Sequence, residues 1–141
     1  MKIINKLPES FIDAVANDYD YNHKEKTYSV SELKNPGWVT NLKRKHHSEI
    51  TFDPIDQFYN VLGSAIHWVL EQTPEQPGEI REKRYIGDYR GFSITGKPDR
   101  IMTTQKELWD YKTASSFKFV MKDFHDWETQ LNVYRWILAK N

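Results

Sequence analysis

The 141-residue chain contains no cysteine. This absence excludes disulfide bonds and zinc sites built from thiolates, and it fits a protein of the reducing cytoplasm. No stretch of 18 consecutive apolar residues occurs, so the sequence predicts no transmembrane helix and no membrane partner. The first residues, Met1–Lys6, lack the apolar stretch of a secretory signal peptide. We therefore expect a cytoplasmic protein.

The chain also lacks an excess of charge of either sign, with 20 Lys and Arg against 20 Asp and Glu. Proteins that bind nucleic acid often carry a basic excess, so any contact with DNA must come from a local patch. The strongest basic cluster is Lys43, Arg44 and Lys45. It predicts contacts to phosphates. The alternative is a cationic helix end that interacts with the helix dipole.

The length predicts one domain, and a hydrophobic content of 38% allows a real core. Hydrophobic periodicity predicts a long helix over 55–72, a closing helix over 124–138, and shorter helices over 8–17 and 36–46. Between the two long helices it predicts strands over 79–86, 91–102 and 108–113, with turns over 87–91 and 103–107. The fold class is therefore α/β. We divide this one domain into an N-terminal helical segment, 1–54, and a core, 55–141.

Two aspartates stand on consecutive predicted strands. Asp99 follows an interruption of its strand at Gly96 and Pro98, and Asp110 lies on the next strand, so a hairpin can bring the two carboxylates together. Close carboxylates repel unless a cation lies between them, and oxygen ligands suit Mg²⁺ or Mn²⁺. Lys112 shares the face of Asp110, where it could orient a water or neutralise negative charge. Surface ion pairs are the alternative.

Four further side chains have both a structural and a functional interpretation. His67 flanks the apolar stripe of the helix over 55–72, where it is either a structural residue or a metal ligand. Glu82 on the first predicted strand either reaches the metal or faces solvent. Gln130 and Tyr134 share one helix face, as a hydrogen-bonded core pair or as support for the metal and the DNA backbone.

Four motifs in this sequence resemble the PD-(D/E)xK nuclease superfamily, in its RecB-like and phage-exonuclease branch. They are GSAIH (63–67), GKPDRI (96–101), WDYKT (109–113) and QLNVY (130–134). The resemblance covers roughly residues 55–140, in the family's order. A lone aspartate–x–lysine arises often by chance, whereas four motifs in order are specific.

The resemblance implies a restriction-endonuclease-like core of helix, three-stranded sheet and helix. It implies hydrolysis of DNA phosphodiester bonds with one or two Mg²⁺ or Mn²⁺ ions. The implied metal ligands are His67, Asp99, Asp110 and the Tyr111 carbonyl. The other implied site residues are Lys112, Glu82, Gln130 and Tyr134. The absence of cysteine excludes the iron–sulfur cluster of some RecB-like nucleases.

The expected role is an exonuclease in phage recombination or DNA repair. Its partners would be DNA and a recombination or repair protein, and its location would be the host cytoplasm if a phage encodes it. The alternative is an inactive nuclease-fold module that binds DNA or recruits a partner. The family core continues into a strand after the last helix, for which this sequence has no residues. Either the chain is truncated or that strand is supplied differently, and an unpaired edge would favour association.

Overall fold

The computed structural model describes residues 8–18, 24–50, 53–114 and 116–141. The helices are α1 (Glu9–Asp18), α2 (Gly37–Lys45), α3 (Phe58–Glu71), α4 (Ser116–Met121) and α5 (His125–Leu138), with 3₁₀ turns η1 (Glu32–Lys34), η2 (His47–Glu49) and η3 (Pro54–Gln57). The strands are β1 (Thr27–Ser29), β2 (Glu79–Arg81), β3 (Tyr85–Tyr89), β4 (Phe92–Gly96), β5 (Arg100–Met102) and β6 (Glu107–Trp109). Within these described ranges, no helix is both long and apolar enough to cross a membrane.

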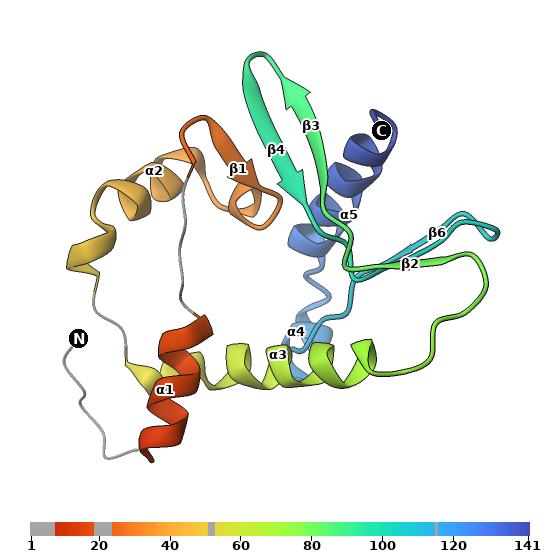
Figure 1. The fold of residues 1–141 in the computed structure, drawn as a ribbon. Helices are drawn as coiled ribbons and strands as arrows, with labels where there is room; N and C mark the ends of the chain where they lie inside the picture. Colours follow the sequence, from red (N-terminus) through yellow and green to blue (C-terminus); the bar gives the residue numbers. More distant parts are fainter. Residues whose placement is uncertain (1–7, 19–23, 51–52, 115) are drawn as a thin grey trace.

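The strands form two three-stranded sheets in the orders β1-β4-β3 and β2-β5-β6. β1 runs parallel to β4, and the other pairs are antiparallel. Tyr85 lies opposite Gly96 in one sheet, and Arg81 lies opposite Arg100 in the other. The chain therefore passes twice from one sheet to the other, through residues 82–84 and 97–99 (Figure 1). These two crossings lie side by side.

The structure confirms the α/β class and the two long helices, and it corrects several details. The strand predicted over 91–102 is two strands, β4 and β5, which lie in different sheets. The predicted strand over 79–86 is two strands, β2 and β3. Because β3 continues to Tyr89, the turn predicted over 87–91 contains only Arg90 and Gly91. The strand predicted over 108–113 ends at Trp109. The sequence analysis did not predict β1, because three residues are too few for an alternating pattern.

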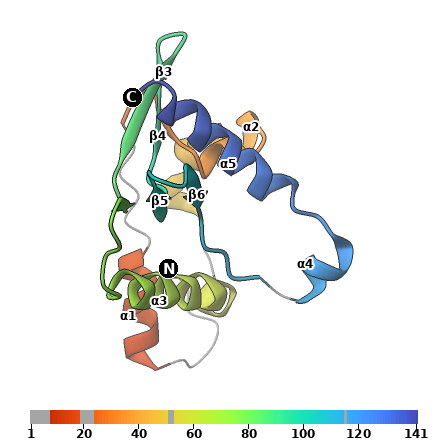
Figure 2. The ribbon, with the colours of Figure 1, turned by 90° about the vertical axis from the view of Figure 1, so that its right-hand side faces the viewer.

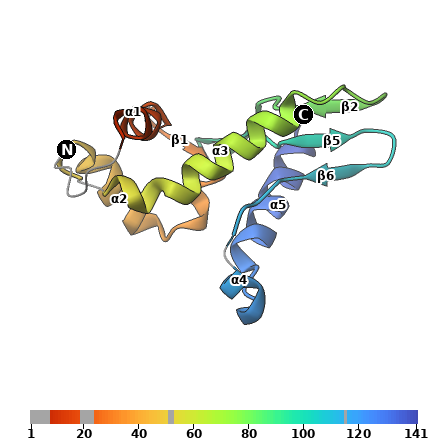
Figure 3. The same ribbon diagram turned by 90° about the horizontal axis from the view of Figure 1, so that it is seen from below.

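α5 packs against β3, β4 and η1 and supplies most of the core (Figures 1 and 2). Val30, Tyr134 and Ile137 are buried together. The partly buried side chains around them are Tyr85, Ile94, Leu108, Val133 and Trp136. α4 stands apart from α3 in two perpendicular views (Figures 2 and 3). The core thus lies between α5 and the β3–β4 hairpin, away from α3.

A buried charge network holds the end of α3 to β2. The Glu79 carboxylate has a fully buried side chain, and it lies 2.7 Å from both Arg81 Nε and Arg100 Nε. The hydrogen bond from Arg81 is the main cause that lowers the pKa of Glu79 to about 2. The Arg81 guanidinium also donates to the carbonyls of Thr73 and Pro74, at 2.6 and 2.9 Å. Carbonyls after a helix end need such donors, so Arg81 fixes where α3 ends relative to the sheet.

Replacement of Gly96 by alanine should destabilise the fold. A Cβ at this position would lie 2.6 Å from Tyr134 Cε1 and 2.8 Å from Val30 Cγ2, so the core would have to shift. Overpacking of this kind costs ~1–3 kcal/mol of unfolding free energy. Urea denaturation measures it, with Gly37→Ala as the matched control, because a Cβ at Gly37 meets nothing within 4 Å. Equal stability of both variants would contradict the packing described here.

Candidate metal centre

His67 connects α3 to the strand ends. Its Nε2 lies 3.1 Å from the Tyr111 carbonyl oxygen, and its Nδ1 lies 3.1 Å from Asp99 Oδ1. α3 can approach because residue 63, one turn earlier, is glycine: a Cβ there would lie 3.2 Å from Thr113 Oγ1. Gly63 therefore provides the close approach that places His67 against the loop after β6.

Asp99 lies in the crossing between β4 and β5, directly after the fully buried Pro98. Its side chain is only 9% exposed, and one oxygen accepts a hydrogen bond from the Tyr111 N–H at 2.5 Å. Burial raises the pKa of Asp99 to about 6, and the negative charge of Asp110 adds to this. The Tyr111 N–H acts in the opposite direction. The carboxylate is thus buried with less positive charge around it than it needs.

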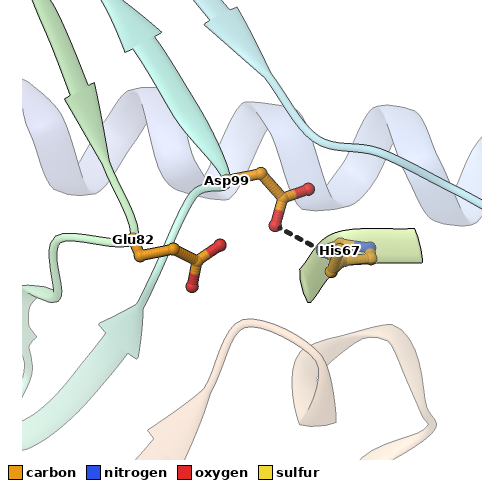
Figure 4. A group of neighbouring side chains, drawn as sticks. All are labelled: His67, Glu82 and Asp99. Carbon is orange, nitrogen blue, oxygen red and sulfur yellow. Dashed lines mark ion pairs between the residues drawn. The ribbon is translucent and has the colours of Figure 1, made fainter. Parts of the chain in front are cut away.

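Glu82 lies in the other crossing, between β2 and β3. Its backbone has φ 48°, a left-handed conformation that is rare for a residue with a side chain, and such conformations cluster at functional sites. The Glu82 N–H donates to the Asp99 carbonyl at 3.3 Å, which joins the two crossings. The Glu82 carboxylate forms an ion pair with Lys97. Ligand atoms of His67, Glu82 and Asp99 all lie within 4.8 Å of one another (Figure 4).

The donor atoms of this group fit a divalent cation. A carbonyl oxygen only accepts, so Nε2 of His67 donates its hydrogen to Tyr111, and Nδ1, the ring nitrogen left for a lone pair, faces Asp99. Two lone pairs that face each other at 3.1 Å need a proton or a cation between them. Adjacent ligands of an octahedral ion at ~2.1 Å are themselves about 3 Å apart. One nitrogen with carboxylate oxygens is a donor set that Mn²⁺ accepts.

Asp110 and Lys112 lie next to this group. The Asp110 side chain is 5% exposed, forms an ion pair with Lys112, and accepts a hydrogen bond from Gln130 Nε2 at 3.2 Å. Gln130 Nε2 also lies 3.2 Å from the Tyr134 hydroxyl, which donates to the Lys97 carbonyl at 3.4 Å. Burial raises the pKa of Tyr134 to about 12, so its hydroxyl keeps its proton. Gln130 and Tyr134 are thus buried residues that hold Asp110 in position.

The structure brings most of the predicted site residues together, although not all in the predicted arrangement. The cluster of possible metal ligands contains Glu82 with His67 and Asp99, whereas the carboxylate of Asp110 is directed to Lys112 and Gln130. Among the described residues, the Oε1 atom of Gln130 is buried without a hydrogen-bond partner. Ligation by Asp110 and by the Tyr111 carbonyl stays a prediction.

The basic cluster on α2 is divided by the structure. Arg44 was predicted to contact phosphates, but its side chain is only 16% exposed. Its guanidinium donates to the Glu32 carboxylate at 2.9 Å and to the Thr27 carbonyl at 2.6 Å, and it lies over the Tyr28 ring. Arg44 therefore takes part in the packing of α2 on β1, and its contact with phosphate stays a prediction. Lys43 and Lys45 are exposed.

The site opens into a cleft of about 620 Å³ between α3 and the strand ends. His67, Glu82, Asp99 and Lys112 line its inner end. The other lining residues are Ser31, Tyr59, Asn60, Gly63, Ser64, Trp68, Glu71, Lys97, Tyr111 and Thr113. The sequence analysis missed Lys97, although it stands two residues before Asp99 at the interruption of the strand. It also missed the cleft-facing side of α3, because only the opposite, apolar stripe has a clear period.

Comparisons with known proteins agree with this arrangement. Residues 79–141 match the family model of the PD-(D/E)XK nuclease superfamily. This segment contains Glu82, Asp99, Asp110 and Lys112, whereas His67 lies before it. The superfamily comprises nucleases that use divalent metals. No curated protein sequence matches the chain.

A solved structure entitled "Crystal structure of SSO0001" shares the fold, with a TM-score of 0.67 and 18% sequence identity. The alignment covers 92% of this chain and 65% of that one. The chain therefore spans about two thirds of the length of that protein, and the likeness extends beyond the matched segment to nearly all of the chain. At this identity the similarity concerns the fold. The PD-(D/E)XK interpretation thus rests on the match of residues 79–141 to the family model.

In the metal-free protein, ionisation of Asp99 should reduce stability as the pH rises from about 4 to about 6. Its pKa is raised from 3.8 to about 6 in the folded chain, so the folded state holds the proton more tightly. Stability from this group is therefore complete below the unfolded pKa and is lost as the pH rises through the folded pKa. Urea denaturation of the wild type and Asp99→Asn across this range, with chelator present, measures it. A stability difference that does not change with pH would contradict the burial of a charged Asp99.

Proposed function

We propose that this protein is a divalent-metal-dependent deoxyribonuclease. The convergence of His67 on Glu82 and Asp99 at the two strand crossings carries the proposal, because it creates a partly buried anionic site beside the paired Asp110 and Lys112. The match of residues 79–141 to the PD-(D/E)XK nuclease superfamily supports the same function. The reaction is hydrolysis of a phosphodiester bond in the cleft.

The metal-holding residues would be His67, Glu82, Asp99 and Asp110, with the Tyr111 carbonyl. A bound Mg²⁺ or Mn²⁺ supplies a Lewis acid for the phosphate and lowers the pKa of a bound water. The protein holds these ligands in a partly buried site, where electrostatic interactions are stronger than in water. Gln130 and Tyr134 keep the Asp110 carboxylate in place through their hydrogen-bond chain.

Lys112 has the geometry of the residue that acts on the reacting groups. It lines the cleft, and its ammonium contacts Asp110 rather than lying free in solvent. There it can donate to the attacking water or to a phosphate oxygen that gains negative charge. Lys97 is exposed on the same cleft and is paired with Glu82. If Glu82 turned to a metal, Lys97 would be available for phosphate.

The motif resemblance extends the proposal to an exonuclease of the RecB-like and phage-exonuclease branch. Such an enzyme would act on DNA in recombination or repair, together with a partner protein of the same process. It would work in the cytoplasm, which is the cytoplasm of the host cell if a phage encodes the protein. The order of the motifs around His67, Asp99, Asp110 and Gln130 supports this branch. Digestion of end-labelled linear and circular DNA tests it, because an exonuclease leaves circles intact.

Substitutions within one motif should separate metal binding from catalysis. Asp110→Asn removes a proposed ligand charge, so both the Mn²⁺-induced rise in melting temperature and DNA cleavage should be lost. Lys112→Ala removes a positive charge beside the ion, so Mn²⁺ binding should persist while cleavage falls ~10²–10⁴-fold. Thermal shift with Mn²⁺, followed by cleavage assays with and without chelator, measures both.

The outcomes of this pair distinguish the enzyme from the inactive module. Full cleavage in chelator would overturn the metal-dependent mechanism. Normal cleavage by Lys112→Ala would make the lysine an ordinary strand-end residue. A wild-type protein that binds DNA but neither cleaves it nor gains stability from Mn²⁺ would be the binding module.

The exposed lysines of α2 should contribute to DNA binding, whereas Arg44 should act on stability. If Lys43 and Lys45 each contact a phosphate, replacing both by alanine should reduce the slope of log K against log salt by about one per lost contact. Arg44→Ala should instead lower the unfolding free energy, because it leaves the buried Glu32 carboxylate without its main partner. Fluorescence anisotropy over a salt series and urea denaturation measure the two effects. An unchanged slope for the double lysine variant would place the DNA surface elsewhere.

A further inference from the structure

Two exposed aromatic side chains border the cleft on α3. Tyr59 and Trp68 are 61% and 62% exposed, and both line the same hollow as His67, Asp99 and Lys112. Exposed apolar side chains that gather beside a cleft are a feature of ligand-binding surfaces. Their position next to the proposed site therefore indicates a role in substrate binding.

The two rings lie on opposite edges of the cleft-facing side of α3. They are nine residues apart, which corresponds to a half-turn difference in direction and to about 13 Å along the helix axis. Between them the cleft is lined by small and polar residues, namely Asn60, Gly63 and Ser64, before it reaches His67. An extended strand could thus run obliquely over a polar floor with one ring near each end.

The exposed apolar stripe of α3 adjoins the cleft at Tyr59. Leu62, Ile66 and Val69 do not line the cleft, although Ile66, seven residues after Tyr59, projects within about 20° of its direction. Tyr59 itself is braced, since its ring meets Phe58 edge-to-face at 5.6 Å, and Phe58 stacks on Phe11 at 6.4 Å. A ring held in place loses little conformational entropy when a ligand stacks on it.

We infer that Tyr59 and Trp68 form a base-stacking platform for an unpaired DNA strand whose backbone crosses the proposed site. The cleft has a volume of about 620 Å³, in the range of small-molecule pockets, so a short stretch of one strand fits inside it. Lys97 and Lys112 supply cations for its phosphates, and aromatic rings accept the faces of any base. The substrate strand must therefore be single-stranded where it enters the cleft.

This inference rests on the proposed nuclease function, and its test uses binding without cleavage. The probe is an oligothymidylate of about eight nucleotides in chelator, compared with an abasic strand of equal length and a blunt duplex. Wild-type protein should prefer the oligothymidylate. Trp68→Ala and Tyr59→Ala should each weaken its binding ~10-fold, as expected for one lost stacking interaction. Neither substitution should change the weaker binding of the abasic strand.

Matched controls separate stacking from damage to the site. Trp38→Ala removes a tryptophan that is 68% exposed on α2 and does not line the cleft, so it should bind like the wild type. Trp68→Phe should restore most of the affinity, because it restores a ring. Unchanged oligothymidylate binding by both alanine variants would overturn the platform, as would equal losses on the abasic strand. A face that instead binds a partner protein would also leave oligothymidylate binding unchanged.

The platform and the nuclease can fail independently. If the protein binds the oligothymidylate through the two rings but does not cleave DNA with metal, the nuclease function is wrong and the stacking platform is supported. If both aromatic variants cleave DNA normally and bind the oligothymidylate like the wild type, the nuclease function is supported and the stacking platform is wrong.

Discussion

The contact of the His67 ring with the strand ends positions α3 and thereby shapes the cleft. α3 contributes little to the core, which lies between α5 and the β3–β4 hairpin. His67 is its link to the Asp99 carboxylate and the Tyr111 carbonyl, and Arg81 holds its end. The cleft exists because α3 is held at these points and is not packed flat on a sheet. The same few contacts thus position both the surface of the cleft and the proposed metal ligands.

The site carries a local excess of negative charge, although the whole chain has zero net charge. Glu82 and Asp99 lie at the crossings, and Asp110 lies beside them after β6. Lys97 is paired with Glu82, and Lys112 is paired with Asp110. Three carboxylates against two lysines leave one negative charge, and Asp99 is the carboxylate without a lysine partner. Burial is the larger cause of the raised pKa of Asp99, and the charge of Asp110 adds to it, so the site lacks charge balance. A cation is the simplest group that restores it.

The sequence indicated which residues come together better than it indicated how they are arranged. Asp99, Asp110 and His67 could be found because their motifs have fixed spacing along the chain, and the two long helices because their apolar residues recur. The break of the first strand at Glu82 could not be predicted, since a left-handed glutamate leaves no mark on a hydrophobic pattern. The inward direction of Arg44 was missed for a related reason. Whether a cation faces solvent or a buried carboxylate is decided by Glu32, twelve residues earlier in the chain.

The two strand crossings have a consequence for how the molecule opens. Residues 82–84 and 97–99 interrupt both ladders at the same level, and one backbone hydrogen bond, from Glu82 to Asp99, spans the gap. Glu82 and Asp99 therefore lie at the junction of two small sheets, where few backbone hydrogen bonds join the strands. Backbone amides at this junction should exchange with solvent sooner than those of β3 and β4. A ligand bound by both Glu82 and Asp99 would hold the two sheets together. Ligand binding and the stabilisation of the contact between the sheets would then be coupled.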